Sequence, residues 1–203
     1  MPDPAPTRWS PYYDAVAKSP PRRTLVYALD HYDAESPRGE RFAVDLGAGS
    51  GTDTVELLRR GWRVLAIDED PAAIPRLRER VGPNASLTAS IGRFEDARWP
   101  NALLVNASFA LFFCTPAAFA SVWRRIVDSL EPGGRFAGQL LGDRDTWAAD
   151  PAMNHHTRAQ AERLFDGLEI EMFNEEEEPN GKTATGAVKH WHTYHVVARK
   201  LGR

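Results

Sequence analysis

One stretch of this chain combines carboxylates and glycines in a pattern that could bind a nucleoside. Asp45 ends an apolar run, and Gly47, Gly49 and Gly51 follow it at alternate positions. Asp68 ends a second apolar run 23 residues after Asp45. Glycine permits positive φ and lets a ligand approach bare backbone, while a carboxylate such as Asp68 can accept hydrogen bonds from both hydroxyls of a ribose.

The chemistry around the glycines argues against a phosphate ligand. The acid at Asp45 suits a ligand with a positive group and suits a phosphate poorly. No lysine follows the glycines as in an ATP-binding loop, and the GxGxG spacing differs from the GxGxxG of dinucleotide-binding proteins. Two simpler interpretations stay open, namely a tight strand–helix turn at the glycines and an Asp68 that only caps a helix.

The elements that would position these residues alternate between strand and helix. We expect five strands, within 39–51, 62–68, 85–96, 102–109 and 135–143. Between and after them we expect helices over 52–61, 70–83 with a kink at Pro75, 115–134, and 156–167 capped by Thr157. Residues 168–200 predict a hairpin that turns at Pro179-Asn180-Gly181. This alternation indicates a parallel α/β sheet with ligands at the carboxyl ends of its strands.

Length and composition favour one domain of ordinary size. The chain has 203 residues, of which 42% are hydrophobic and 26% charged. We expect a single domain over 1–203, with an N-terminal segment and candidate lid at 1–38 and a core at 39–203. A helical pattern runs from about Thr24 to Tyr32 within that segment.

Charge and cysteine content narrow the class of protein. Lys and Arg total 25 and Asp and Glu total 28, which gives a formal net charge of −3 and argues against a nucleic-acid partner. The single cysteine, Cys114, fits a reducing compartment and is expected to be buried. No signal peptide and no apolar run of membrane-spanning length is visible, so we expect a cytoplasmic protein with no membrane partner.

Five motifs in order give the chain a resemblance to a known family. The stretches "VDLGAGSG", "VLAIDED", "GRFEDA", "NASFAL" and "LEPGGRFAGQLLG" resemble the ordered motifs of class I S-adenosylmethionine-dependent methyltransferases over about residues 40–200. Small single-domain enzymes of the tellurite-resistance-like group and their small-molecule relatives are the most similar in pattern. The resemblance implies a Rossmann-like seven-stranded sheet in order 3-2-1-4-5-7-6, with strand 7 antiparallel and helices on both faces.

The resemblance also implies a set of residues that would bind S-adenosylmethionine and its product S-adenosylhomocysteine. The cofactor-binding candidates follow the motifs and are Asp45, Gly47, Ala48, Gly49, Gly51, Asp68, Glu69, Phe94, Glu95, Asp96, Asn106 and Ala107. Of these, Asp45, Gly47 and Gly49 would face the methionine part and Asp68 the ribose. Glu69 would lie beside the adenosine, residues 94–96 would border the adenine, and Asn106 and Ala107 would lie near the sulfonium.

Candidates for a proton-transfer step are histidines and one asparagine. His155 and His156 lie where this family often places acceptor-site residues, although a packed, hydrogen-bonded histidine is the commoner case. On the last strand, His190 and His192 share one face, and Trp191, Thr193 and His195 share the other. The pair on one face lacks a third ligand with convincing spacing, so we expect no metal.

Asn106 and several aromatic residues have two interpretations each. Asn106 could hold an amine acceptor, or it could form a hydrogen bond that shapes the end of its strand. Trp9, Tyr12 and Tyr13 could close over the cofactor as a lid, or could only pack the N-terminal segment on the domain. Phe109 joins them as a candidate for contact with the substrate. The acidic run Glu175–Glu178 is expected to be a solvated approach to the hairpin turn.

We therefore expect a methyltransferase that acts on the O, N or S atom of a small molecule by in-line displacement, as a monomer or homodimer. A relative that binds the cofactor or a partner without catalysis is the main alternative. A protein or nucleic-acid methyltransferase is a third alternative, for which Asn106 is the only indication.

Overall fold

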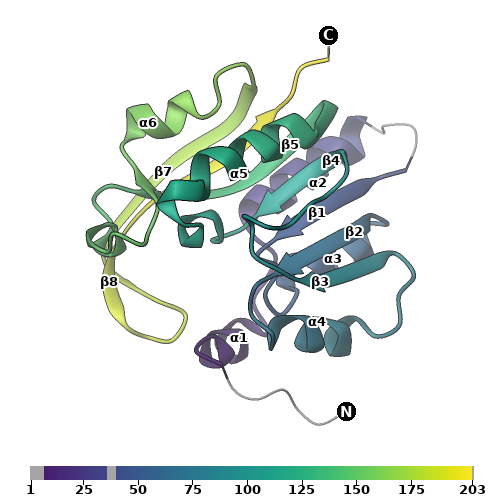
Figure 1. Ribbon diagram of the computed structural model, residues 1–203, viewed down its shortest axis with the longest axis horizontal. Coiled ribbons are helices and arrows are strands. Elements are labelled where there is room, and N and C mark those ends of the chain that lie inside the picture. The colour runs from purple at the N-terminus through teal and green to yellow at the C-terminus, as the bar shows by residue number, and fades with distance from the viewer. Residues whose placement is uncertain (1–6, 36–39, 203) are drawn as a thin grey trace.

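The computed structural model describes residues 7–35 and 40–202, and its centre is one twisted sheet (Figure 1). The strands lie in the order β3-β2-β1-β4-β5-β8-β7. In chain order they are β1 (Phe42–Leu46), β2 (Arg63–Asp68), β3 (Leu87–Ile91), β4 (Ala102–Ala107), β5 (Leu130–Gly142), β7 (Glu169–Lys182) and β8 (Val188–Arg199). An additional two-residue strand, β6 (His155–His156), pairs with β5 off this path.

This topology confirms the predicted fold class. When β6 is set aside, the order is the expected 3-2-1-4-5-7-6, and β8 is antiparallel to both β5 and β7. The first five strands are parallel. Strand β6 was not predicted, because two residues are too few to carry a period-2 pattern.

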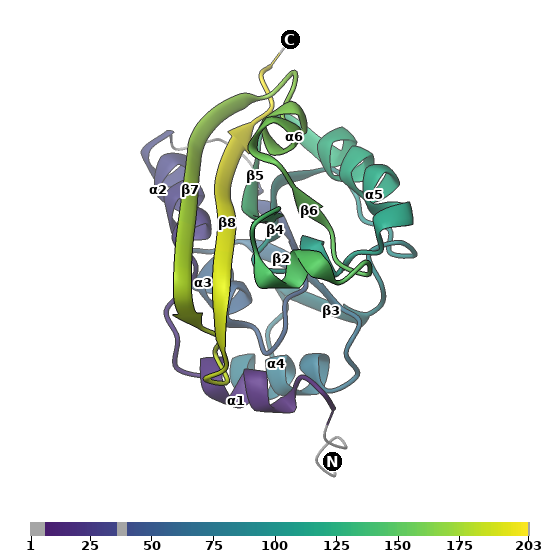
Figure 2. The ribbon, with the colours of Figure 1, turned by 90° about the vertical axis from the view of Figure 1, so that its left-hand side faces the viewer.

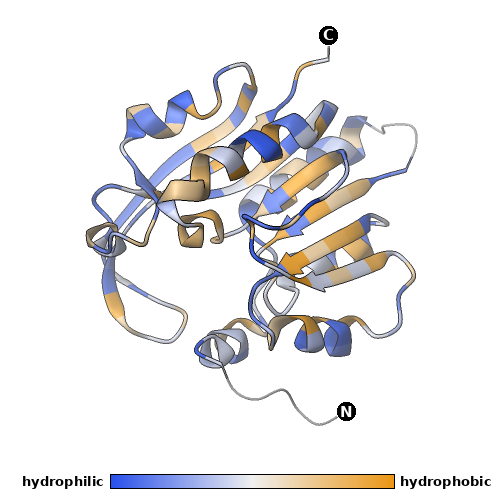
Figure 3. Cartoon of the chain, in the orientation of Figure 1, coloured by the Kyte–Doolittle hydropathy of each residue, from blue (hydrophilic) through white to orange (hydrophobic). Residues whose placement is uncertain are grey.

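Helices cover both faces of the sheet, as Figures 1 and 2 show. On one face, a buried apolar cluster joins the sheet to α2 (Arg23–Glu35), α3 (Thr52–Arg59) and α4 (Ala73–Val81). On the other face, a second cluster joins it to α5 (Pro116–Ser129) and α6 (Arg158–Arg163). Hydropathy follows this arrangement, since apolar residues concentrate on the strands and on the sheet-facing sides of the helices (Figure 3).

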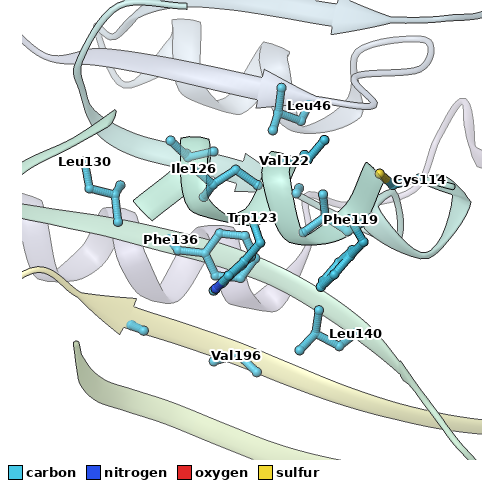
Figure 4. Close-up of a cluster of buried hydrophobic side chains, with 14 of the residues drawn as sticks. Leu46, Cys114, Phe119, Val122, Trp123, Ile126, Leu130, Phe136, Leu140 and Val196 are labelled. Carbon is cyan, nitrogen blue, oxygen red and sulfur yellow. The ribbon is translucent and has the colours of Figure 1, made fainter. Parts of the chain in front are cut away.

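The second cluster is built around aromatic rings (Figure 4). Trp123 of α5 packs edge-on against Phe136 of β5 at 5.0 Å and against Phe165 at 5.1 Å between ring centroids. Its indole N–H donates to the carbonyl of Leu164 at 2.9 Å, so the buried ring leaves no polar atom unpaired. Cys114 is buried in the same cluster, as predicted.

The hairpin does not turn where the sequence pattern predicted. Strand β7 continues through Pro179-Asn180-Gly181, which form an irregularity between Glu178 and Gly181, and the chain reverses at 183–187 instead. There the N–H of Thr183 donates to the carbonyl of Ala187 at 2.8 Å, and Gly186 has φ +90°. The Pro-Asn-Gly sequence is a turn signal, but here it accommodates a bulge, where Trp191 packs over the bare Cα of Gly181.

Two helices also differ from the sequence expectations. Pro75 does not kink a helix, because α4 begins at Ala73 and the proline lies in its first turn, where a missing N–H removes no hydrogen bond. Gly51 precedes α3 as its N-cap. A short helix, α1 (Ser10–Val16), precedes α2 and was not predicted.

Candidate functional site

A cavity of about 600 Å³ lies at the carboxyl ends of the parallel strands. Its wall combines the loop after β1, the end of β2, the loop after β4, helix α1 and the tip of the β7–β8 hairpin. Figures 1 and 2 both place α1 and the hairpin tip next to each other at this end of the sheet. A cavity of this size is in the range that binds small ligands and cofactors.

The glycine loop presents bare backbone to this cavity. Gly47 and Gly49 line the cavity with φ of +72° and +53°. A Cβ at Gly47 would lie 2.5 Å from the Cβ of Ala110, and one at Gly49 would lie 3.2 Å from the ring of Tyr13. Both positions therefore require glycine for conformation and for space.

The third glycine acts differently from the first two. Gly51 does not line the cavity, and a Cβ there would meet Leu77 of α4 at 2.2 Å. Its φ of +88° and this close approach show that it lets α3 and α4 pack together. Ala48 is buried in the apolar cluster behind the loop.

Asp68 lies on the cavity wall and is tied to the glycine loop. One carboxylate oxygen accepts the N–H of Gly49 at 2.8 Å, and the other accepts the N–H of Asp70 at 2.9 Å. The carboxyl is buried, and this burial raises its pKa above the usual range. Each oxygen keeps a second lone pair, which can accept a hydroxyl from the cavity.

Asp45 lies behind the loop and not on the cavity wall. Its carboxylate accepts the hydroxyl of Thr54 at 2.5 Å and the side-chain amide of Asn106 at 2.9 Å. Asn106 also donates to Asp53 at 3.1 Å. Burial and the neighbouring Asp53 raise the pKa of Asp45 well above its usual range. Asp45 was expected to face the methionine part, and Asn106 and Ala107 were expected near the sulfonium. All three are buried and do not line the cavity.

Of the residues expected near the adenosine, two line the cavity and two do not. Phe94 and Glu69 line the cavity, whereas Glu95 and Asp96 do not. Glu95 accepts the hydroxyl of Thr115 at 2.9 Å and its N–H at 3.2 Å. Burial acts to raise the pKa of Glu95, but hydrogen bonds from its own backbone, from Arg93 and from Thr115 lower it to about 2.

The three aromatic lid candidates of the N-terminal segment lie on the cavity wall. Trp9, Tyr12 and Tyr13 line it, and Trp9 packs edge-on against Phe113 at 4.9 Å. Tyr13 is 3% exposed, and burial together with the charges of Asp68 and Asp70 raises the pKa of its hydroxyl. Helix α1 thus covers the glycine loop and the acid at the end of β2.

The far end of the cavity is formed by the last strand and by Phe109. Trp191, Thr193 and His195 line the cavity, so the predicted shared face of β8 is the face that borders it. Nε2 of His195 lies 2.9 Å from a carboxylate oxygen of Glu176. Phe109, a predicted substrate contact, also lines this end.

The two histidines with a predicted catalytic role lie elsewhere. Neither His155 nor His156 lines the cavity. Instead, His156 packs against Phe119 at 4.9 Å, and burial lowers its pKa to about 4. On the opposite face of β8, Nε2 of His190 lies 2.8 Å from Glu177 and Nε2 of His192 lies 2.9 Å from Glu175. In the described part of the chain, no three His, Cys, Asp or Glu side chains group as metal ligands.

Two residues near the end of the cavity formed by β8 and Phe109 were not predicted from the sequence. Gln139 of β5 lies opposite His195 in the sheet register, and Arg22 lies between α1 and α2 on the cavity wall. Gln139 had a sequence signal, since a polar residue within the apolar run of a central strand needs a buried partner. Arg22 had none, because it is one of several basic residues in its segment.

Comparison with known proteins identifies the domain. A family described as a methyltransferase domain matches residues 43–134, which contain the glycine loop and Asp68. Over these residues, just under half of the chain, the sequence is similar to class I S-adenosylmethionine-dependent methyltransferase domains. None of the helices in the described ranges has the length and apolar content needed to cross a bilayer.

Curated relatives match part of this chain at low sequence identity. The carboxy-S-adenosyl-L-methionine synthase of Klebsiella pneumoniae is 26% identical over 134 residues, which cover 62% of this chain and 54% of that protein. The chain thus spans about half the length of the curated relatives it matches.

Solved structures share the fold of the methyltransferase domain at low sequence identity. TehB from Haemophilus influenzae aligns with a TM-score of 0.71 at 18% identity, over 86% of this chain and 62% of that one. A 1,6-didemethyltoxoflavin-N1-methyltransferase from Burkholderia thailandensis aligns with a TM-score of 0.63 at 21% identity, over 89% and 79% of the two chains. That neighbour contains bound S-adenosylhomocysteine and 1,6-didemethyltoxoflavin.

Proposed function

We propose that this chain is an S-adenosylmethionine-dependent methyltransferase that acts on a small-molecule acceptor. One observation carries the proposal. The same cavity contains the bare glycine loop and the carboxylate of Asp68, which could accept ribose hydroxyls, and it extends to an aromatic end. We call this end, lined by Phe109, Trp147 and Trp191, the second compartment. Relatives of the matched family and neighbours with bound S-adenosylhomocysteine support the same activity.

The residues present fit this cofactor. Gly47 and Gly49 would let its amino-acid end approach the backbone, because a side chain at either position would fill that space. Asp68 would accept the ribose hydroxyls on lone pairs that the backbone N–H groups leave free. Phe94 would pack against the base. Asp45 and Asn106 would hold the loop in place from behind.

When bound, the cofactor would supply a methyl group on a sulfonium. The acceptor atom would form its bond to the methyl carbon in line as the carbon–sulfur bond breaks, and S-adenosylhomocysteine would leave. The protein has to hold the acceptor at near-attack distance and exclude water. Tyr12, Trp147 and Trp191 wall the second compartment and would position a flat acceptor. Helix α1 would cover the bound pair, as a lid, through Trp9 and Tyr13.

Calorimetry with S-adenosylmethionine and S-adenosylhomocysteine tests the cofactor assignment. We expect both to bind with one site per chain, and absence of binding at millimolar concentration would refute the proposal. Mass spectrometry of products from a panel of phenols, amines, thiols and metalloid oxyanions then tests transfer, with a mass increase of one methyl group as the expected result.

These experiments, extended to bulk RNA, DNA and protein as acceptors and to analysis of the cofactor after reaction, separate the alternatives. Cofactor binding without turnover of any acceptor would favour a non-catalytic relative. Methylation of bulk RNA, DNA or protein but not of small acceptors would favour a macromolecular substrate. A product in which the cofactor itself gains a carboxyl group would favour the activity named for the Klebsiella pneumoniae relative.

A further inference from the structure

The second compartment of the cavity is organised around a strained phenylalanine. Phe109 has φ +51°, and it is the one non-glycine residue with positive φ in the described ranges. Its ring lies 6.1 Å from those of Trp191 and His195, and the guanidinium carbon of Arg22 lies 4.8 Å from its centroid. Strain of this kind persists where surrounding contacts fix the backbone, often at ligand sites.

Gln139 supplies the contact that fixes Phe109. Its side-chain oxygen accepts the backbone N–H of Phe109 at 2.9 Å, so the amide nitrogen must point the other way. That nitrogen donates to the hydroxyl of Thr24 at 3.0 Å and lies 3.5 Å from Nδ1 of His195. Because an amide nitrogen only donates, Nδ1 of His195 is the lone-pair nitrogen.

The contact of Nε2, the other ring nitrogen of His195, independently indicates the same tautomer. Nε2 lies 2.9 Å from the carboxylate of Glu176, which only accepts, so Nε2 carries the hydrogen. Burial lowers the pKa of His195 despite Glu176, and Arg23 and Arg22 lower it further. His195 is therefore a neutral ring that directs an N–H, and not a lone pair, toward the cavity.

A ligand oxygen could take the place of Glu176 as the acceptor of the Nε2–H of His195. The side chain of Glu176 is 63% exposed, whereas Gln139, on the other side of the His195 ring, is only 1% exposed. The Arg22 guanidinium borders the same Phe109 ring, and one of its nitrogens lies 3.5 Å from the hydroxyl of Tyr12. A ligand oxygen that displaces the Glu176 carboxylate would meet two donors, one neutral and one cationic.

We propose that this compartment binds a planar aromatic acceptor through an oxygen that carries negative charge, held by Nε2–H of His195 and the guanidinium of Arg22. The inference rests on the proposed function, because it names the acceptor class of the same cavity. It also assigns His195 as a hydrogen-bond donor to the acceptor and Gln139 as the positioning residue that sets its tautomer. Where this oxygen is itself the atom that receives the methyl group, it reaches the site already deprotonated and needs no general base.

A matched ligand series tests the charge preference. We would titrate the protein, with and without S-adenosylhomocysteine, with 1-naphthoate, 1-naphthamide and 1-naphthylmethylamine by calorimetry. The carboxylate should bind about tenfold tighter than the amide, because hydrogen bonds to a charged group are the stronger class. Equal or tighter binding of the amine, or no binding of any member, would overturn the inference.

Variants connect that preference to the named donors. Arg22→Gln and His195→Phe should each weaken 1-naphthoate about tenfold and leave the amide within a factor of two to three. Glu176→Gln should instead tighten 1-naphthoate by about two- to fivefold, since an exposed competing charge is removed. Glu177→Gln is the matched control, because Glu177 pairs with His190 on the opposite face of the strand. Weaker binding by Glu176→Gln would contradict the displacement step.

The tautomer has its own readout. Nitrogen-15 NMR of the histidine rings should show His195 with hydrogen on Nε2 and a bare Nδ1. Gln139→Glu should place hydrogen on both ring nitrogens, because carboxylates would then accept from Nδ1–H and from Nε2–H, so the signal of the bare Nδ1 should disappear. Gln139→Leu serves as a second variant and should give a mixture of tautomers. A hydrogen on Nδ1 in the unmodified protein would overturn the assignment.

These outcomes are distinguishable from failure of the proposed function. If S-adenosylhomocysteine binds and methyl transfer occurs on a cationic or neutral acceptor, the function stands and the acceptor class is wrong. If the cofactor does not bind but 1-naphthoate binds through His195 and Arg22, the compartment stands and the methyltransferase proposal fails.

Discussion

At the scale of single residues, the site separates carboxylates that meet the cavity from those that support it. Asp68 is on the wall, where its oxygens still have capacity to accept. Asp45 has the same chemistry, but Thr54 and Asn106 take up its oxygens behind the loop. Residue type and spacing are alike at the two positions, so only their neighbours decide which one touches a ligand.

Asp68→Ala should weaken binding of S-adenosylhomocysteine. Each hydrogen bond from a ribose hydroxyl to this carboxylate is worth about 1.5–3 kcal/mol, so the Kd should rise at least tenfold. Calorimetry measures the change. Asp96→Ala is the control, because Asp96 is exposed and off the wall, and it should leave the Kd unchanged. Equal effects of the two substitutions would contradict the assignment of Asp68.

His156 makes the fold sensitive to acid. Its pKa is about 4 in the folded chain and about 6.5 when unfolded, so only the unfolded state takes up a proton between these values. Stability should therefore fall as pH drops from about 6.5 to 4, by about 2 kcal/mol at pH 5. His156→Leu should remove most of this loss in urea titrations at pH 7 and pH 5, whereas the exposed His155→Leu should retain it.

At the scale of elements, α1 and the hairpin close the cavity from two sides. Helix α1 has seven residues and is held by aromatic contacts and by an ion pair of 2.6 Å between Asp14 and Arg76. A helix this short is not stable alone, so its position depends on what it packs against. Tyr13 provides the contact with the glycine loop.

Tyr13→Ala should loosen this cover. The buried ring contributes about 1.5–3 kcal/mol to the closed arrangement, so dissociation of S-adenosylhomocysteine should become about tenfold faster. Stopped-flow fluorescence of the tryptophans near the cavity follows the rate. Tyr27→Phe, which alters only a hydroxyl bonded to the carbonyl of Glu171, is a remote control. An unchanged rate in Tyr13→Ala would show that α1 does not retain the ligand.

At the scale of the whole molecule, one buried arginine joins the N-terminal segment to the end of the sheet. Arg135 of β5 has no exposed side-chain surface and donates to Glu35 of α2 and to Glu171 of β7, each at 2.6 Å. Its guanidinium carbon also lies 4.5 Å from the centroid of Tyr32. The packing of α2, β5 and β7, which lie far apart in sequence, therefore depends on the charge of Arg135.

Arg135→Met should destabilise the protein by about 3–5 kcal/mol, because it leaves the shielded carboxylate of Glu171 without its partner. Urea unfolding gives the free energy. The double variant Arg135→Met with Glu171→Leu should recover much of that loss, since no unpaired charge remains there. Arg59→Met removes an exposed pair with Glu56 and should cost at most about 1 kcal/mol.

The strand order was implied by the resemblance of the ordered motifs to a known family. The amino-acid sequence by itself determined the alternation of strands and helices, the glycine loop, the place of Asp68 and the face of β8 that carries Trp191, Thr193 and His195. These follow from periods of 2 and 3.6 residues and from turn chemistry, which act within an element or between neighbours. The Pro-Asn-Gly prediction failed because the same residues that favour a turn also fit a bulge, and strand pairing decides between them.

Only the tertiary structure decided which side chains work together. The contact between Asp45 and Asn106 spans 61 residues, and that between Gln139 and Thr24 spans 115. No local pattern encodes such pairs, because they form when packed elements bring side chains within hydrogen-bond distance. Because of that packing, Asp45 and His156 do not line the cavity. Arg22, Gln139 and His195 instead lie around Phe109, where the acceptor is proposed to bind.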